Sequence, residues 1–171
     1  MMKDERYPIG QFQCPEIILE KHVTSWIEDI RLFPRQLAEA LTGMSEELLG
    51  KTYRENGWTV SQIVHHIADS HMNSYIRFKL ALTEEEPTIK PYNEAEWAEL
   101  PDSEMPIAVS YKIIESLHAR WSYLLTHLTA EQFQRAFKHP DSGLIKLEHA
   151  VGLYAWHGKH HLAHIQNAIV N

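Results

Sequence analysis

Apolar side chains recur at helical spacing in four long segments, and this pattern constrains the fold more than any other feature. The segments cover about residues 21–41, 60–82, 107–128 and 146–170. The second begins most clearly, because Thr59 is followed three residues later by Gln62, the spacing of a capping box. No strand pattern of any length competes with these segments. The sequence therefore predicts an all-α protein built as a four-helix bundle.

The connections between these segments carry most of the turn residues. Short helical turns are expected at Ser45–Leu49 and at Ala130–Phe137, the latter followed by a turn at residues 139–143. Inside the first segment, Pro34 should kink the helix because proline has no N–H to donate. Roughly 20 residues separate the second segment from the third, and a connector of that length predicts a crossover or a lid.

Composition narrows the class of protein. A chain of 171 residues fits one domain, spanning residues 1–171, and its net charge of −7 argues against a nucleic-acid or acidic-membrane binder. No run of about 18 apolar residues is present, so no membrane span is predicted. The single cysteine, Cys14, cannot form an internal disulfide and suits a reducing, cytoplasmic location.

The distribution of the histidines indicates a functional site, because seven of the twelve fall into two clusters. In the last segment His160 and His164 are one helical turn apart, a spacing that lets two imidazoles reach one metal ion, and His157 and His161 form a competing pair with the same spacing. A third ligand must come from elsewhere, and the second segment supplies the other cluster: His65, His66 and His71. Buried histidines also occur as ordinary hydrogen-bonded core residues.

Helical rotation separates these histidines into two sets. His71 and His161 lie near the centres of their apolar stripes, whereas His66, His160 and His164 lie to the same side of theirs. Two neighbouring helices turn flanks of the same rotational sense toward each other only if they run antiparallel. An antiparallel pair would also place these three residues at the same height along the bundle. The sequence therefore predicts an up-down-down-up bundle with a long crossover between the second and third helices, and a side seam holding His66, His160 and His164.

Three neutral imidazoles leave room on a divalent ion for water or substrate, the arrangement of a catalytic site. Such an ion can activate water, or bind a thiol as thiolate. We expect one divalent ion per chain, with zinc as the default and nickel, iron or manganese as alternatives. Asp69 and Glu148 are the acidic residues nearest in sequence to orient the ligands, and no catalytic residue can be assigned.

The predicted topology also places two loops at the histidine end of the bundle, residues 43–58 and 97–106. They would form the rim of a pocket for a small-molecule substrate. Candidate substrate contacts on this rim are Tyr53, Arg54, Asn56, Trp58 and Trp97.

Several stretches together resemble one family. They are residues 7–10 (Tyr-Pro-Ile-Gly), 57–60 (Gly-Trp-Thr-Val), the run 65–78 beginning His-His-Ile-Ala-Asp-Ser-His, residues 117–121, and 154–164. With them the chain resembles the DinB/YfiT-like superfamily, and most closely its YfiT-type metal-dependent hydrolases. The resemblance implies an up-down-down-up bundle, a homodimer, and the metal ligands His66, His160 and His164.

The same resemblance bears on function. It implies a metal-dependent hydrolase in which the three-histidine site activates water. Related members transfer low-molecular-weight thiols such as bacillithiol to electrophiles, so a metal-dependent thiol S-transferase is the alternative. Either activity implies a small-molecule substrate, and thiol transfer would use a low-molecular-weight thiol as a second substrate.

Overall fold

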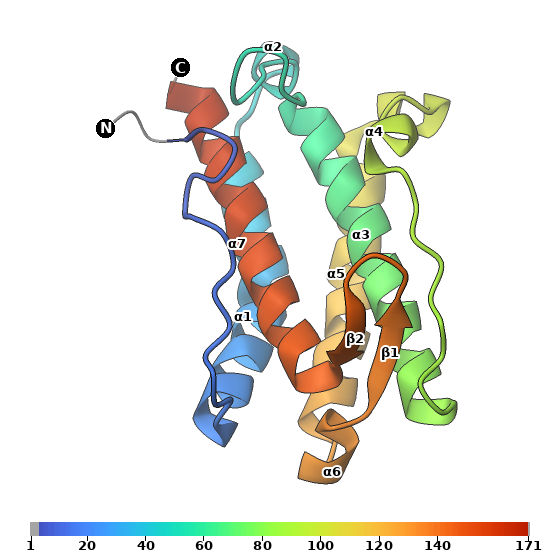
Figure 1. Ribbon diagram of the computed structural model, residues 1–171. Helices are drawn as coiled ribbons and strands as arrows, with labels where there is room; N and C mark the ends of the chain where they lie inside the picture. Colours follow the sequence, from blue (N-terminus) through green and yellow to red (C-terminus); the bar gives the residue numbers. More distant parts are fainter. Residues whose placement is uncertain (1–3, 171) are drawn as a thin grey trace.

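Four long helices form the protein, as predicted. The computed structural model describes residues 4–170, so residues 1–3 and 171 of the predicted domain lie outside it. The helices are α1 (Glu20–Leu41), α3 (Val60–Thr83), α5 (Ile107–Thr126) and α7 (Leu147–Val170). Figure 1 shows α1 and α7 running in one direction and α3 and α5 in the other. This up-down-down-up order confirms the prediction.

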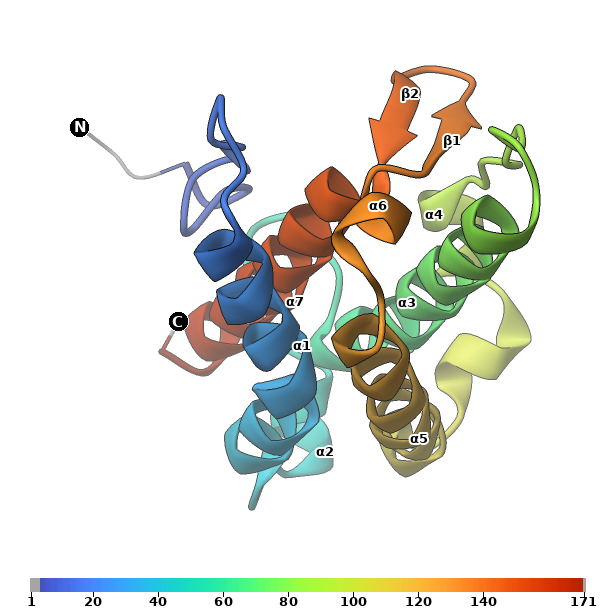
Figure 2. The same ribbon diagram turned by 90° about the horizontal axis from the view of Figure 1, so that it is seen from below.

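Each long helix packs against two others. Helix α1 lies against α7 and α5, and α3 lies against α5 and α7, so the four helices form a closed ring in cross-section (Figure 2). Because α3 and α7 are antiparallel neighbours, the two histidine clusters lie on adjoining helices. The capping box at the start of α3 is also present, with the Gln62 N–H donating to Thr59 Oγ1 at 3.1 Å.

The long connector is a crossover held along α3. It contains α4 (Glu94–Trp97) and a 3-10 turn, η1 (Pro101–Glu104). One end is fixed by hydrogen bonds of Pro87 and Ile89 with Lys138, each 2.9 Å. The other end is fixed to α3, where Gln62 Nε2 donates to the Ala98 carbonyl at 3.3 Å.

The remaining connections contain α2 (Glu46–Leu49), α6 (Ala130–Phe133), β1 (Ala136–His139) and β2 (Gly143–Lys146). The predicted helical turn at Ala130–Phe137 ends at Phe133, after which the chain enters an antiparallel hairpin. The expectation that no strands would form was therefore wrong. Each strand has only four residues, too few to show alternation in the sequence, and Gly143 permits the turn through its φ of +76°.

The interior holds two apolar clusters with histidines between them. One contains Phe78, Trp121 and Leu147, and the other contains Ile63 and Ile165. His71, for example, contacts Phe33 of one cluster and Trp121 of the other. Among the described residues, no helix is both long and apolar enough to cross a membrane.

Candidate metal centre

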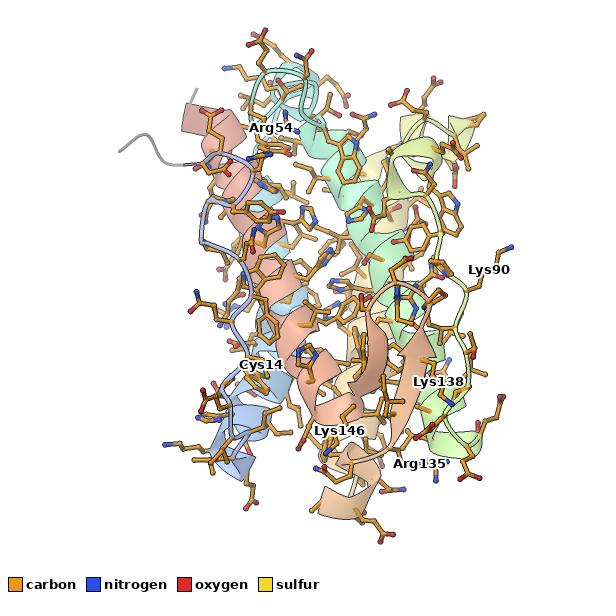
Figure 3. The ribbon with its side chains drawn as sticks, viewed as in Figure 1. Cys14, Arg54, Lys90, Arg135, Lys138 and Lys146 are labelled. Carbon is orange, nitrogen blue, oxygen red and sulfur yellow. The ribbon has the colours of Figure 1, made fainter. Side chains whose placement is uncertain are left out.

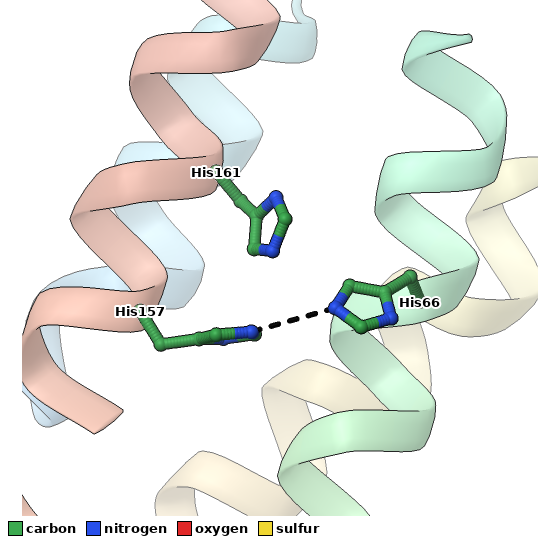
Figure 4. A group of neighbouring side chains, drawn as sticks. All are labelled: His66, His157 and His161. Atoms are coloured by element: carbon green, nitrogen blue, oxygen red, sulfur yellow. Dashed lines mark hydrogen bonds between the residues drawn. The ribbon is translucent and has the colours of Figure 1, made fainter. Parts of the chain in front are cut away.

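Three imidazoles from α3 and α7 meet in the layer between the apolar clusters. They belong to His66, His157 and His161, and one ring nitrogen from each lies within 4.8 Å of the others (Figure 4). His157 and His161 are one turn apart on α7 and reach across the seam to His66 on α3. Figure 3 shows nitrogen-bearing rings filling the space between these two helices.

The spacing of two of these rings suits a shared metal ion. His66 Nε2 and His157 Nε2 are 3.4 Å apart. Two imidazoles bound to a tetrahedral zinc at about 2.0–2.1 Å have ligand nitrogens about 3.3–3.4 Å apart. Other contacts between imidazole nitrogens in this protein measure 2.7, 3.0 and 3.3 Å. The donor set therefore fits a divalent ion.

A second group of imidazoles adjoins the first. His160, His161 and His164, all buried, also have ring nitrogens within 4.8 Å of one another. The predicted combination of His66 with His160 and His164 does not appear among the groups that the described residues form. His160 instead stacks on Trp156, with ring centroids 4.5 Å apart, and its Nδ1 is buried without a hydrogen-bond partner.

The imidazole of His164 contacts that of His161 through their Nδ1 atoms. Its Nε2 lies 3.2 Å from the Arg6 carbonyl oxygen, which only accepts, so Nε2 carries the proton. Nδ1 of His164 is then an acceptor, 3.3 Å from Nδ1 of His161. This contact assigns the His161 proton to Nδ1. In Figure 4 the other ring nitrogen of His161 points toward His66 and His157.

Burial keeps these imidazoles neutral. Desolvation lowers the pKa of His66 to about 4, and it lowers the pKa of His157 and of His161 well below the ordinary value of 6.5. Neutral imidazole is the form that binds metals. His66 and His161 are buried, and His157 is half-buried.

The predicted rim residues differ in how close they lie to the histidines. The Trp58 ring is 4.6 Å from that of His66, and the Tyr53 ring stacks on His164 at 3.9 Å. Arg54 Nε donates to the Tyr53 hydroxyl at 3.2 Å, at the end of the bundle where α3 begins (Figure 3). Trp58 therefore contacts the group of His66, and Tyr53 contacts the group of His164.

The other two rim candidates have no contact of this kind. Trp97 packs on Tyr92 with ring centroids 4.4 Å apart, and 37% of its surface is exposed. Asn56 is exposed in the loop before α3 and adopts a left-handed backbone conformation, with φ of 54°.

Neither acid that was expected to orient the ligands does so through a hydrogen bond in the described structure. Glu148 accepts from Gln134 Nε2 at 2.7 Å on the surface. Burial, together with the charge of Asp102, raises the pKa of Asp69 to about 6. Asp69 lies one turn after His66 on α3, and its charge interacts with Asp102 of the crossover.

Comparison with known proteins now identifies the family. The model of the DinB superfamily matches residues 30–165. The chain belongs to the DinB superfamily. Among solved structures it resembles YfiT from Bacillus subtilis, with a TM-score of 0.91 and 49% identity over 95% of this chain and 94% of that one. That protein is described as "a probable metal-dependent hydrolase with an unusual four-helix bundle topology".

Other DinB-like relatives are similar over nearly their whole length. A protein of Halalkalibacterium halodurans is 53% identical over 167 residues, covering 98% of both chains. One from Bacillus cereus strain AH820 is 56% identical over 164 residues, covering 96% of this chain and 95% of its own. Both carry the name "putative metal-dependent hydrolase".

Proposed function

We propose that the protein is a metal-dependent hydrolase that binds one divalent ion, zinc by default, through His66, His157 and His161. The observation that carries the proposal is the meeting of these three buried or half-buried imidazoles, with two facing nitrogens 3.4 Å apart. The names of the relatives support the same class of activity. The combination of His66 with His160 and His164 is the competing ligand set.

The residues of the chain have distinct parts in this proposal. The three imidazoles hold the ion and leave at least one position open, and the ion supplies Lewis-acid activation of water or of a substrate oxygen. Trp58 lies over His66 and presents an apolar ring to a bound small molecule.

Metal content of single variants tests the ligand set. Untagged wild-type protein, measured by mass spectrometry after reconstitution with zinc, should hold about one ion per chain. His66→Ala, His157→Ala and His161→Ala should each lose it, and His160→Ala should retain it. Loss of metal in His160→Ala and His164→Ala with retention in His157→Ala would instead establish the competing set. A wild type that binds no added ion would contradict the proposal.

Activity assays then separate the two reactions. Hydrolysis of small ester and amide substrates should require the ion and should proceed without any added thiol. Turnover of an electrophile only when a low-molecular-weight thiol is supplied would instead establish thiol S-transfer. In that case the metal-binding proposal would stand, and the reaction class would change.

A further inference from the structure

Arg54 brings a positive charge to the histidine end of the bundle. Its side chain is half-buried in the loop that precedes α3 (Figure 3). The ion pairs of the described residues use other cations, so no carboxylate in that part of the chain neutralises this guanidinium. In a chain with a net charge of −7, a half-buried arginine of this kind marks a place where an anion from outside can bind.

The loop holds the guanidinium in one orientation. Nε donates to the Tyr53 hydroxyl at 3.2 Å, and Nη1 donates to the Glu55 carbonyl at 2.8 Å. The turn closes where the Gly57 N–H donates to the Arg54 carbonyl at 3.0 Å. A Cβ added at Gly57 would lie 2.8 Å from Arg54 Cγ and 3.0 Å from Tyr53 Cε1, so the glycine makes room for both side chains. A side chain held in this way loses little conformational entropy when it binds a ligand.

Part of the guanidinium remains available to a ligand. Arginine carries five N–H groups, and one on Nε and one on Nη1 are used by the bonds to Tyr53 and Glu55. The others have no acceptor among the described residues. Neighbouring N–H groups on Nη1 and Nη2 match two oxygens of a carboxylate or of a phosphate. Asp4 does not take this place, because Arg6 Nε and Nη2 donate to its oxygens at 3.1 and 3.0 Å.

Tyr53 connects Arg54 to the histidines. The guanidinium carbon lies 5.3 Å from the centre of the Tyr53 ring, which is buried and stacks on His164 with ring centres 3.9 Å apart. His164 in turn lies beside His161, with ring centres 5.3 Å apart. Arg54 therefore adjoins both ligand sets through this chain of contacts, since His164 belongs to the competing set and His161 to the proposed one.

The same loop also provides an apolar surface. Trp58 is half-buried, and its ring lies 4.6 Å from that of His66. The loop from Tyr53 to Trp58 therefore supplies the histidine end with both an apolar ring and a guanidinium. A small molecule that uses both has an apolar or aromatic body and a carboxylate or phosphate at one end.

We propose that Arg54 is a specificity-determining residue that binds the carboxylate or phosphate of an anionic substrate, whose reacting group lies at the metal. The reaction of this substrate rests on the proposed function, but the binding of an anion by Arg54 does not require a reaction. The two can therefore fail separately.

The first test compares the affinity of the full-length protein for three small aromatic probes, measured by isothermal titration calorimetry after incubation with zinc. Benzoate and phenyl phosphate carry an anionic group, and benzamide is the neutral counterpart of benzoate. The wild type should bind at least one of the anions about 10-fold more tightly than Arg54→Gln does, and should bind benzamide no more tightly than the variant. The anion with the larger difference identifies the preferred group. Equal anion affinities in the two proteins would overturn the proposal, as would a wild type that binds neither anion.

Arg120→Gln is the matched control. Arg120 also lacks an ion pair among the described residues, and its guanidinium carbon lies 5.7 Å from the centre of the Tyr75 ring. It is exposed on α5, a helix that contributes no histidine to either metal-binding group. Arg120→Gln removes the same charge and should bind the anions as the wild type does. Equal weakening in Arg120→Gln and Arg54→Gln would mean that net charge governs binding, and would overturn the assignment to Arg54.

Arg54→Lys tests the shape of the group apart from its charge. Lysine keeps the positive charge but has no planar fork, so the affinity for the preferred anion should lie between those of the wild type and Arg54→Gln. This variant also decides the question if Arg54→Gln does not fold. Full wild-type affinity in Arg54→Lys would exclude bidentate binding by the guanidinium.

The second test is the kcat/KM of zinc-reconstituted protein for two 4-nitrophenyl esters of matched length. The adipate monoester carries a free carboxylate, and the heptanoate ester is neutral. Arg54→Gln should lower kcat/KM about 10-fold for the adipate ester and leave that for the heptanoate ester unchanged. An equal loss for both esters would overturn the specificity role. Hydrolysis of neither ester would contradict the proposed function alone, and the calorimetry would still decide whether Arg54 binds anions.

Discussion

Histidine has two uses in the interior of this protein. His66, His157 and His161 bring ring nitrogens together, whereas His71 and His118 make short hydrogen bonds on both ring nitrogens. His65 belongs with the second kind, because its ring joins Ser110 at 2.7 Å and the Met105 carbonyl at 2.9 Å. His160 differs from all of these, because its buried Nδ1 has no hydrogen-bond partner.

Neutral buried histidines should make the metal-free protein sensitive to acid. The pKa of His118 falls from 6.5 to about 4 because of burial, so the unfolded chain takes up a proton between these values and the folded chain does not. The stability from this group is complete above about pH 6.5 and is lost as pH falls toward 4, amounting to about 3 kcal/mol. Urea unfolding of metal-free wild type at several pH values should show the decline.

The contribution of His118 to this loss of stability is measured by comparing the wild type with His118→Phe. The phenyl ring cannot take up a proton, so the variant should lose less free energy of unfolding between about pH 7 and about pH 5 than the wild type does. Parallel declines in the two proteins would show that His118 does not contribute.

Asp69 should have the opposite effect on stability. Its folded pKa of about 6 lies above the ordinary 3.8, so the folded state binds more protons between these values and stability falls as pH rises through them. Asp69→Asn should therefore stabilise the protein above pH 6, by about 1 kcal/mol for a half-exposed group, and have little effect near pH 4. Thermal unfolding at both pH values measures this, and a variant that is less stable at pH 7 would contradict it.

At the scale of elements, the contact between α1 and α7 depends on a glycine. A Cβ added at Gly158 would lie 2.8 Å from Phe33 Cδ2, closer than real contacts allow. The Phe33 ring is buried and lies 5.7 Å from the His71 ring and 5.3 Å from the His118 ring, so its movement would displace these two buried histidines. The absence of a side chain at residue 158 therefore sets how closely these helices approach.

Gly158→Ala should accordingly destabilise the protein by about 1–3 kcal/mol, the usual effect of overpacking a core. The matched control is Gly50→Ala, where the nearest atoms to an added Cβ are at the ordinary distance of 3.6 Å and the backbone has φ of −82°. Urea denaturation of the two variants makes the comparison. Equal stability would mean that α1 and α7 can separate at no cost.

At the scale of the whole molecule, the proposed metal-binding group lies between two apolar clusters. Trp121, Phe78 and Leu147 are fully buried in one, and Ile63 and Ile165 in the other. Burial of side chains of this size contributes about 1.5–3 kcal/mol each, so the bundle has a core independent of any ion.

Removal of the ion should therefore leave a folded protein with a lower Tm. A ligand that binds only the folded state stabilises it by about 2.7 kcal/mol at a free concentration 100 times its Kd. Circular dichroism with and without chelator should show unchanged helix content and a Tm that rises with added zinc. Loss of helix on chelation would mean that the ion is structural.

The sequence by itself determined the four helices and their order. Capping at Thr59, apolar periodicity and proline-rich connections are local signals, and the level of the histidines along α3 and α7 required these helices to be antiparallel. It also identified both histidine clusters and the competing pairs within them. The hairpin was missed because four-residue strands leave no periodic signal.

Only the tertiary structure decided which imidazoles meet. Successive residues on a helix differ by about 100° in direction, so a modest rotation of α7 about its own axis exchanges His157 and His161 for His160 and His164 at the seam. That rotation is set by packing, including the close approach of Gly158 to Phe33. The hydrogen bond between His118 and the Ile30 carbonyl joins positions 88 residues apart, and no local pattern can predict it.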